Sequence, residues 1–424
     1  MRVLILLGNL YPKPSSVANC SKFLLSSLEQ EGYKVDIVSN VCGREEIEKS
    51  ISTKIYYHGI PDKYAYYVGK INGYFSDKYP KSINMFLAKV VKIPLYIRFQ
   101  IFCQEKNMGG WSISKSVNRI IQLDKDQPFD LMISFSQPFI THLIAYKYLR
   151  KCGRNIRWIV YEYDPYSLSV VISKINILAK YQRRIQENRV FKLAEKIILT
   201  KEIYDLYLET AFRVYRYKFD FLDYRLLQSP DTLGESNSSE EIDESTLCFV
   251  YAGGFYKKIR NPQYMLEVFD RLTIDYRLIL LTNYQEKEFI SFIKRYPHKF
   301  ILELKNTHEY AISLMKKANI LVSIGNMIKI QVPAKVFEYL GLGKPIIHFA
   351  KIKDDPIIKY LDSYPLALII NEYEGSIAEK VDTIERFVEE VKNKKLTYSE
   401  VVECLPNHNE KIVAGKFLSI INSI

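Results

Sequence analysis

The chain has 424 residues, more than one ordinary hydrophobic core accommodates, which predicts two domains of about 200 residues each. Its composition, 48% hydrophobic and 25% charged, is typical of a soluble globular protein, and no apolar run reaches the ~18 residues that a membrane-spanning helix needs. The net charge of +12 is uneven: residues 1–225 hold 35 Lys+Arg and 21 Asp+Glu, a net of +14, so we expect this half to face an anionic partner.

The cysteines and histidines indicate a reduced compartment without zinc. The six cysteines are scattered with no Cys-x-x-Cys pair, and the six histidines do not cluster with them. The chain begins MRVLILLGNLYP, which favours a strand over a signal peptide because the apolar run is short and no small-residue cleavage site follows. We therefore expect a cytoplasmic protein.

The first elements predict a Rossmann-type βαβ unit. Residues 2–7 form an apolar run that favours a buried strand, and residues 34–39 favour a second one. Between them lies a helix that Ser15 or Ser16 can cap, after a loop that Gly8 opens. The loop lacks a G-x-G-x-x-G pattern, so a dinucleotide site here has no support.

Residues 54–119 do not alternate cleanly between strand and helix patterns. They hold eleven basic and three acidic residues, with aromatic residues interspersed throughout. Three interpretations stay open: ordinary helices whose aromatics pack inward, a surface for an anionic membrane or a lipid-linked acceptor, and a nucleic-acid site. No nucleic-acid motif accompanies the last interpretation, so we expect no nucleic-acid partner.

The strand predicted at residues 157–161 ends in two carboxylates. Glu162 and Asp164 lie where the carboxyl end of a parallel strand presents ligand-binding residues in open α/β sheets. Either could orient or deprotonate a hydroxyl, and capping of the next turn by Asp164 is the structural alternative. His142, on the helix after a strand at 129–134, is more typical of a satisfied structural histidine than of a base.

The second half begins after a change in composition. Residues 229–245, SPDTLGESNSSEEIDES, are polar and acidic without periodicity and predict a linker or mobile loop. The alternation of strands and helices then restarts at residue 247 and continues to a strand at 345–349. This order predicts a second parallel sheet that is covered by helices on both faces.

The segment 251–262, YAGGFYKKIRNP, carries the first chemical signal of this half. Gly253 and Gly254 let the backbone approach a ligand closely, because glycine has no side chain. Arg260 precedes the next helix, where its planar guanidinium can grip a diphosphate through two hydrogen bonds. The two lysines of the segment are further candidates, and the alternative is a set of solvated loop cations.

The second chemical signal lies in residues 329–349, KIQVPAKVFEYLGLGKPIIHF. Pro333 suits the first turn of a short helix, and two glycines predict the end of that helix before a buried strand. The free N–H groups of a helix start attract anions, and the cation Lys335 in the first turn suggests an anion nearby. Glu338, one turn further, can accept hydrogen bonds from hydroxyl groups. Together these features suit a nucleotide sugar.

These two segments, in this order, resemble the donor-binding signature of GT-B glycosyltransferases, particularly family 4 and its relatives in bacterial polysaccharide synthesis. The resemblance implies that Glu338, seven residues before Pro345, binds the ribose of the nucleotide. It also implies that Gly253, Gly254 and Arg260 bind the donor diphosphate.

The resemblance extends to both sides of the expected cleft. It implies that Gln331, Pro333 and Lys335 line the donor site, and that the loop opened by Gly8, with its two cap serines, faces the cleft from the acceptor side. One departure concerns Ile330, which stands where many retaining members have a glutamate that contacts the transferred sugar. Gln331 is the nearest polar substitute.

Two further features depart from the family or lie outside it. Many members carry a histidine just after the strand at 157–161, where this chain has Glu162 and Asp164 instead, so the role of that histidine does not carry over. Asp124 and Asp126 spell the D-x-D of the other main glycosyltransferase fold, where the motif holds a divalent metal. Here we interpret them as surface charge.

We therefore predict an α/β protein of the GT-B fold, with two Rossmann-like parallel-sheet domains facing a cleft. The predicted acceptor-binding domain covers residues 1–228 and a final helix at about 406–424, which in this fold crosses back to the first domain. Residues 229–245 form the predicted linker, and residues 246–405 form the predicted donor-binding domain.

The predicted function is transfer of a sugar from a nucleotide diphosphate sugar to a hydroxyl of a glycan or lipid-linked glycan acceptor. The leaving diphosphate is stabilised electrostatically, so no metal or other cofactor is required. We expect the protein to be cytoplasmic and to lie peripherally on the inner face of the cytoplasmic membrane, against anionic lipid. Two alternatives stay open: a nucleotide-sugar epimerase of the GT-B fold, and a non-catalytic nucleotide-sugar-binding or scaffold subunit, which the missing first glutamate allows.

Overall fold

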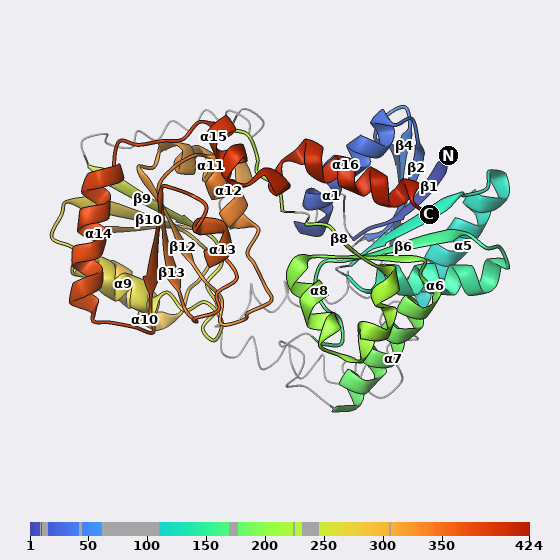
Figure 1. Cartoon of the computed structure of the whole chain (residues 1–424), viewed down its shortest axis with the longest axis horizontal. Helices are drawn as coiled ribbons and strands as arrows, with labels where there is room; N and C mark the ends of the chain where they lie inside the picture. The colour runs from blue at the N-terminus through green and yellow to red at the C-terminus, as the bar shows by residue number, and fades with distance from the viewer. Residues whose placement is uncertain are drawn as a thin grey trace. The chain divides into compact units, whose positions relative to one another are not determined.

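The computed structural model describes residues 1–8, 10, 16–41, 45–61, 110–136, 138–168, 177–223, 225–230, 246–304 and 307–424. The chain forms two compact units, Met1–Tyr224 with Val413–Ile424 (unit 1) and Arg225–Ile412 (unit 2) (Figure 1). The sequence predicts the domain boundaries at residues 228 and 405, and most of the predicted linker lies outside the described residues.

Unit 1 is built on an eight-stranded sheet with the order β3-β4-β2-β1-β5-β6-β7-β8. Neighbouring strands are parallel except β3 and β4, which pair antiparallel at one edge. The strands are β1 (Arg2–Leu6), β2 (Lys34–Val41), β3 (Ile47–Ser50), β4 (Ile55–Pro61), β5 (Leu131–Phe135), β6 (Arg157–Glu162), β7 (Lys196–Leu199) and β8 (Phe219–Phe221). The described helices are α1 (Ser16–Gln30), α5 (Gly110–Asp126), α6 (Ile140–Cys152), α7 (Ile177–Leu193), α8 (Lys201–Leu208), the 3₁₀ helix η1 (Ala211–Lys218) and α16 (Glu410–Asn422), whose larger part belongs to this unit.

Helices cover both faces of this sheet. Leu4 and Leu6 of β1 belong to one hydrophobic cluster with Ile120 of α5 and Ile144 of α6. Ile5, which points to the opposite face, is also fully buried, and Figure 1 shows α1 and α16 on that side. Burial on both faces explains why the strands read as continuous apolar runs rather than as alternating patterns.

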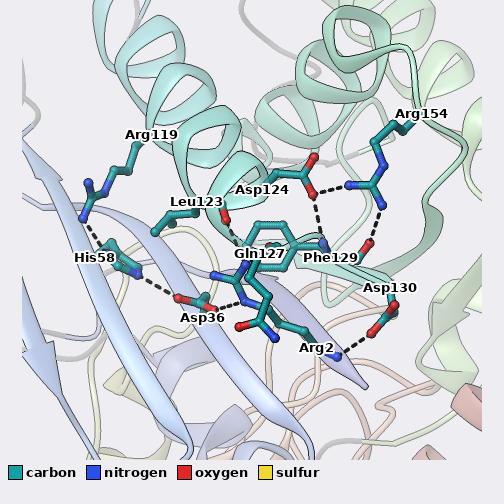
Figure 2. A network of polar contacts seen from close by, with 10 residues as sticks. All are labelled: Arg2, Asp36, His58, Arg119, Leu123, Asp124, Gln127, Phe129, Asp130 and Arg154. Carbon is teal, nitrogen blue, oxygen red and sulfur yellow. Dashed lines mark hydrogen bonds and ion pairs between the residues drawn. The ribbon is translucent and has the colours of Figure 1, made fainter.

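A polar network ties the unit 1 sheet to α5 (Figure 2). The buried Arg2 donates from Nε to Asp36 Oδ2 at 2.9 Å and from Nη1 to the carbonyl oxygen of Leu123 at 2.8 Å. The other Asp36 oxygen lies 3.0 Å from His58 Nε2, and Arg119 Nη2 lies 3.3 Å from His58 Nδ1. Arg2 and Asp36 stand near the amino ends of their strands, away from the edge where α/β sheets bind ligands, so the network is a structural clamp.

We expect Asp36→Asn to destabilise the protein and to reduce its loss of stability in acid. Burial raises the pKa of Asp36, but hydrogen bonds from His58 and Arg2 outweigh burial and hold that pKa below its usual 3.8. A depressed folded-state pKa means that the carboxylate stabilises the fold above its unfolded pKa, and that this contribution is lost as the pH falls through the folded pKa. The substitution leaves Arg2 without its charged partner, which costs roughly 1–3 kcal/mol at neutral pH.

Urea unfolding at neutral pH and at stepwise lower pH measures both effects. Asp205→Asn is the matched control, because Asp205 forms an exposed ion pair with Lys201 at 2.7 Å, one turn along α8. Exposed pairs of this kind contribute little to stability. Equal losses for the two variants, or an unchanged pH dependence for Asp36→Asn, would contradict the clamp.

Unit 2 is built on a parallel six-stranded sheet with the order β11-β10-β9-β12-β13-β14, which is the 3-2-1-4-5-6 order of nucleotide-binding Rossmann sheets. The strands are β9 (Leu247–Ala252), β10 (Tyr276–Leu281), β11 (Phe300–Glu303), β12 (Ile320–Ile324), β13 (Ile346–Ala350) and β14 (Ala367–Asn371). The helices are α9 (Gln263–Asp270), α10 (Lys287–Arg295), α11 (His308–Lys317), α12 (Lys335–Gly341), α13 (Ile358–Leu361), α14 (Ile377–Val391), α15 (Tyr398–Cys404) and the 3₁₀ turn η2 (Pro406–His408). The predicted fold class, two Rossmann-like parallel sheets, is confirmed.

One prediction about the end of unit 2 is wrong. The polar run at residues 393–400 predicts a loose linker before the final helix, but α15 begins at Tyr398. Thr397 accepts a hydrogen bond from the backbone N–H of Glu400, and the Glu400 side chain accepts one from the backbone N–H of Thr397. This capping box was readable as T-x-x-E in the sequence.

Candidate functional site

The switch point of the unit 2 sheet brings together the two segments singled out in the sequence. The strand order reverses between β9 and β12, which are adjacent in the sheet. In open α/β sheets, ligands bind outside the carboxyl ends of the strands at such a point. Gly253, Gly254 and Arg260 follow β9, and Gln331 and Pro333 follow β12, so five donor candidates lie in the two loops that begin there.

Arg260 ties these two loops to each other. Its Nε donates to Asn326 Oδ1 at 2.9 Å and its Nη1 donates to the carbonyl oxygen of Gly254 at 3.3 Å. Asn326 is buried, and its Nδ2 donates to the carbonyl oxygen of Gln331 at 3.3 Å. The guanidinium is partly exposed, so it is held in a defined position while part of it remains accessible. Asn326 was not among the residues inferred from the sequence.

The two glycines after β9 also have a local role within their own loop. Neither has a left-handed backbone conformation. A Cβ on Gly253 would lie 3.0 Å from the Tyr251 hydroxyl oxygen, and one on Gly254 would lie 3.1 Å from the Tyr256 hydroxyl oxygen. Tyr251 in turn donates to the carbonyl oxygen of Gly254 at 3.2 Å. The glycines therefore give room to tyrosine side chains of their own loop, whether or not a ligand approaches.

The short helix α12 is attached directly to the carboxyl end of β9. The buried Tyr339 hydroxyl accepts from the backbone N–H of Ala252 at 2.7 Å and lies 3.1 Å from its carbonyl oxygen. The helix begins at Lys335, not at Pro333 as predicted, because the preceding turn is tighter: the N–H of Val336 bonds the carbonyl oxygen of Pro333 at 3.2 Å. Tyr339 thus fixes the helix that carries Glu338.

Lys335 and Glu338 form an ion pair within α12. Lys335 Nζ lies 2.6 Å from Glu338 Oε2, and the two side chains are 27% and 17% exposed. The cation therefore has a partner on its own helix, and its position at the helix start does not by itself require an external anion. A ligand that bonded Glu338 would have to compete with this pair.

A buried histidine supports the loop after β12. His348 of β13 lies between Ser323 and Asp355, with its Nδ1 3.1 Å from Ser323 Oγ and its Nε2 3.2 Å from Asp355 Oδ2. Asp355 packs so closely under the loop that a Cβ on Gly325 would come within 1.7 Å of its Oδ2. Sequence reasoning missed this support, because the four residues are separated along the chain.

The acceptor-side candidates of unit 1 are only partly described. Gly8 follows β1 and is buried, and its carbonyl oxygen accepts from Ser39 Oγ at 3.1 Å. Ser15 lies outside the described residues, and Ser16 is the first residue of α1 with no described side chain. Most of the basic and aromatic segment 54–119 likewise lies outside the described part of the chain.

Glu162 is fully buried and pairs with His142. Glu162 Oε2 lies 2.8 Å from His142 Nε2, and His142 Nδ1 lies 2.7 Å from Ser134 Oγ, which accepts from Trp158 Nε1 at 2.8 Å. Burial raises the pKa of Glu162 well above its usual range, with the charge of Asp164 adding to the rise, and lowers the pKa of His142 to about 3. We therefore assign a neutral pair in which the Glu162 hydroxyl donates to Nε2. No surface of this carboxyl group is open to a substrate.

Asp164 is the carboxylate that remains accessible at this strand end. It is half-buried, and burial raises its pKa from 3.8 to about 6. A carboxylate with a pKa near 6 is ionised at neutral pH and still basic enough to accept a proton from a hydroxyl. Of Glu162 and Asp164, the geometry therefore favours Asp164 as the candidate base.

Glu187 of α7 holds the segment that carries Asp164. Its carboxylate accepts from the backbone N–H groups of Tyr166 at 3.1 Å and Ser167 at 3.3 Å, from the Ser167 hydroxyl, and from the Tyr207 hydroxyl of α8. Burial raises the pKa of Glu187 to about 7, although these donors oppose the rise. The sequence held no local signal for Glu187, which reads as an ordinary residue of a basic amphipathic helix.

Comparison with known proteins identifies the fold. No protein-family model matches the sequence. No curated protein sequence matches it either. Among solved structures, sucrose-phosphate synthase from Thermosynechococcus elongatus is similar over 100% of this chain and 98% of its own, with a TM-score of 0.65 and 11% identity. The lipopolysaccharide outer core galactosyltransferase WaaB is similar over 100% and 99%, with a TM-score of 0.57 and 12% identity.

The chain has the GT-B fold. The UDP-GlcNAc 2-epimerase from Neisseria meningitidis is also similar over 100% of both chains, with a TM-score of 0.57 and 9% identity. Identities of 9–12% concern the architecture and not the chemistry. The predicted GT-B architecture is thereby confirmed.

The D-x-D pattern is surface charge at Asp126, which is exposed, but not at Asp124. Asp124 is 8% exposed, its Oδ1 accepts from the backbone N–H of Phe129 at 2.9 Å, and it pairs with Arg154. The interpretation is wrong for Asp124, because the turn after α5 folds back over that side chain. No helix within the described residues is long and apolar enough to cross a membrane.

Proposed function

We propose that this protein transfers a sugar from a nucleotide diphosphate sugar to a hydroxyl of a glycan or lipid-linked glycan acceptor. One observation carries the proposal: Arg260 joins the two loops at the switch point of the unit 2 sheet and keeps part of its guanidinium exposed. A fixed and accessible guanidinium at that point suits a diphosphate. The similar UDP-GlcNAc 2-epimerase structure supports the choice of donor, since it is described as bound to UDP-GlcNAc.

In the proposed reaction, unit 2 binds the donor. Arg260 contacts the diphosphate, Glu338 exchanges its pairing with Lys335 for the ribose hydroxyls, and Lys335 is then free to approach a phosphate. As the bond between the sugar carbon and the phosphate oxygen breaks, the diphosphate leaves with the bonding electrons. The two cations stabilise that developing charge, so the mechanism requires no metal.

Unit 1 supplies the base in this proposal. The acceptor hydroxyl gives its proton to the ionised carboxylate of Asp164 while its oxygen forms the new bond to the sugar carbon. A pKa raised to about 6 suits this role at neutral pH. Glu162 contributes indirectly, because its buried pair with His142 lies beneath the same strand end.

A nucleotide-sugar epimerase is the second candidate. It is favoured by the similarity to a UDP-GlcNAc 2-epimerase over the full length of both chains. An epimerase converts its donor with no acceptor present, whereas a transferase releases a nucleoside diphosphate as it glycosylates the acceptor. Analysis of the donor products with and without acceptor separates the two.

We further propose that the protein is cytoplasmic and works at an anionic membrane that carries the acceptor. The net charge of +14 over residues 1–225 supports this, because a basic half is attracted to anionic lipid. Cosedimentation with anionic vesicles at low salt tests the association.

Nucleotide binding is the first test of the donor site. Calorimetric titration with UDP, GDP, ADP and CMP is expected to find one nucleotide that binds tightly. We expect Arg260→Ala and Glu338→Gln each to weaken that binding by roughly 1–3 kcal/mol, because each removes a hydrogen bond to or from a charged group.

Two control variants match these changes. Arg271→Ala removes an exposed arginine of the same unit, and Glu389→Gln breaks an exposed Lys–Glu pair of the same i,i+3 type, with Lys392 at 3.0 Å. Both are expected to bind the nucleotide as the wild type does. Failure of all four nucleotides to bind would contradict an active transferase and favour a scaffold subunit.

A further inference from the structure

The 3₁₀ helix η1 sorts its side chains into rows. A 3₁₀ helix has three residues per turn, so side chains three positions apart lie in line. Over Ala211–Lys218 this spacing gives one row of Phe212, Tyr215 and Lys218, a second row of Arg213 and Arg216, and a third row of Ala211, Val214 and Tyr217.

The first row fastens η1 to the body of unit 1. Phe212 is 3% exposed, and its ring packs edge-on against Phe191 with centroids 5.4 Å apart. Tyr215 donates to Asn188 Oδ1 at 2.7 Å. Lys218 Nζ donates to the carbonyl oxygen of Lys192, near the end of α7, at 2.9 Å and to that of Ala194, just after the helix, at 2.6 Å. The helix is therefore a fixed element whose other two rows face outward.

The other two rows are exposed. Val214 is 64% exposed and Tyr217 is 73% exposed, the largest values among the exposed large hydrophobic residues that the structure describes. Arg213 and Arg216 are exposed beside them. We name as the η1 surface the four residues Arg213, Val214, Arg216 and Tyr217. It consists of a guanidinium row next to an apolar row, with no acidic residue within η1.

Further apolar side chains are exposed next to the η1 surface in the chain. Leu193, at the end of α7, is 42% exposed, and Phe221, in the edge strand β8, is 45% exposed. Asp220, the acidic residue that follows η1, is paired with Lys196 at 2.9 Å. Side chains that combine cations with exposed apolar and aromatic groups are typical of elements that lie at the boundary of a membrane.

We propose that the η1 surface docks on an anionic lipid bilayer. Val214 and Tyr217 enter the headgroup region, and Arg213 and Arg216 contact lipid phosphates. A second copy of the chain fits this surface less well, because residues 1–225 of any copy carry the same net charge of +14 and repel each other. That the partner is a membrane rests on the association proposed above. The assignment of that association to the η1 surface is the additional inference.

The location of η1 separates it from the candidate catalytic edge. β8 begins directly after η1 and runs parallel to β7. Therefore η1 lies at the amino end of these strands, whereas Asp164 follows the carboxyl end of β6. Substitutions in the η1 surface are expected to leave nucleotide binding unchanged.

The experiment is cosedimentation of the full chain with vesicles of phosphatidylglycerol and phosphatidylcholine, compared with pure phosphatidylcholine. Arg213→Gln with Arg216→Gln, and Val214→Ser with Tyr217→Ser, are each expected to weaken binding to the anionic vesicles roughly tenfold or more. The matched control, Arg271→Gln with Arg386→Gln, removes two exposed arginines of unit 2 and is expected to bind as the wild type does. Tyr217→Trp is expected to lose fluorescence in vesicles of brominated lipid.

Three other outcomes would overturn the proposal, and each has a different meaning. A wild type that ignores anionic vesicles at low salt removes both the membrane association and the η1 surface. Vesicle binding that survives both double substitutions keeps the association but assigns it elsewhere on the basic half. A dimer in sedimentation velocity that Val214→Ser with Tyr217→Ser abolishes, without vesicle binding, assigns the surface to a second copy.

Discussion

Replacement of Asp164 by asparagine is expected to lower turnover by about 10²–10⁴-fold, the range that a general base contributes. Asparagine keeps the size of the side chain and cannot accept the proton of the acceptor hydroxyl. For the wild type, burial raises the pKa of Asp164 to about 6. Since the base works in its ionised form, kcat/KM is expected to rise with pH through about 6 and then level off. The assay is release of nucleoside diphosphate from the nucleotide sugar that calorimetry selects.

Glu162→Gln is the matched control for this prediction. Glu162 lies two residues away and is also a carboxyl group with a raised pKa, but it is fully buried against His142. A glutamine can donate to His142 Nε2 in its place, so we expect a far smaller loss of turnover. Full activity in Asp164→Asn, or an equal loss in Glu162→Gln, would show that Asp164 is not the base.

The second large effect is expected on stability, from Gly343→Ala. Gly343 has a φ of +70°. Residues with a Cβ adopt this left-handed backbone conformation only at a cost in free energy. A Cβ there would also stand 2.0 Å from the carbonyl oxygen of Leu396, a backbone atom that cannot rotate away. The N–H of Leu396 donates to the carbonyl oxygen of Gly343 at 2.8 Å, so the two segments are held together. We expect a loss of roughly 2–5 kcal/mol in unfolding free energy.

Gly153→Ala isolates the backbone part of this cost. Gly153 has nearly the same φ, +68°, but a Cβ there meets nothing within 4 Å. We expect it to lose only roughly 1–2 kcal/mol. Urea unfolding followed by circular dichroism measures both variants. Equal losses would mean that the loop of Leu396 moves aside without cost. Because Gly343 follows α12, the Gly343→Ala variant is also expected to bind nucleotide more weakly.

Much of the architecture followed from local sequence pattern. The apolar runs at β1, β9 and β12 are strands because both faces of each sheet are covered, and such burial selects hydrophobic residues at every position. The antiparallel strand β3 was missed, because its residues Ile47–Ser50 are largely exposed at the sheet edge and carry no apolar run. An edge strand is defined by its hydrogen bonds to β4, which no local pattern reports.

The site residues that belong to a recognisable local sequence pattern could be predicted from the sequence. Arg260 and Glu338 stood out by residue type and by their distance from glycine and proline, and both lie in or after the loops at the switch point. Their partners were not predictable. Asn326 lies 66 residues from Arg260, and Glu187 lies 20 residues or more from the groups it holds. Such contacts depend on which helix packs against which strand end.

The sequence by itself therefore determined two parallel sheets, their order of elements and the loops that carry the donor candidates, because these follow from hydrophobic periodicity and from the backbone needs of glycine and proline. Only the tertiary structure decided which carboxylate is accessible. Glu162 and Asp164 are neighbours of equal charge in the sequence, but packing buries Glu162 against His142 and leaves Asp164 half-buried. Burial and the partner across the fold, not residue type, decide what each carboxyl group can do.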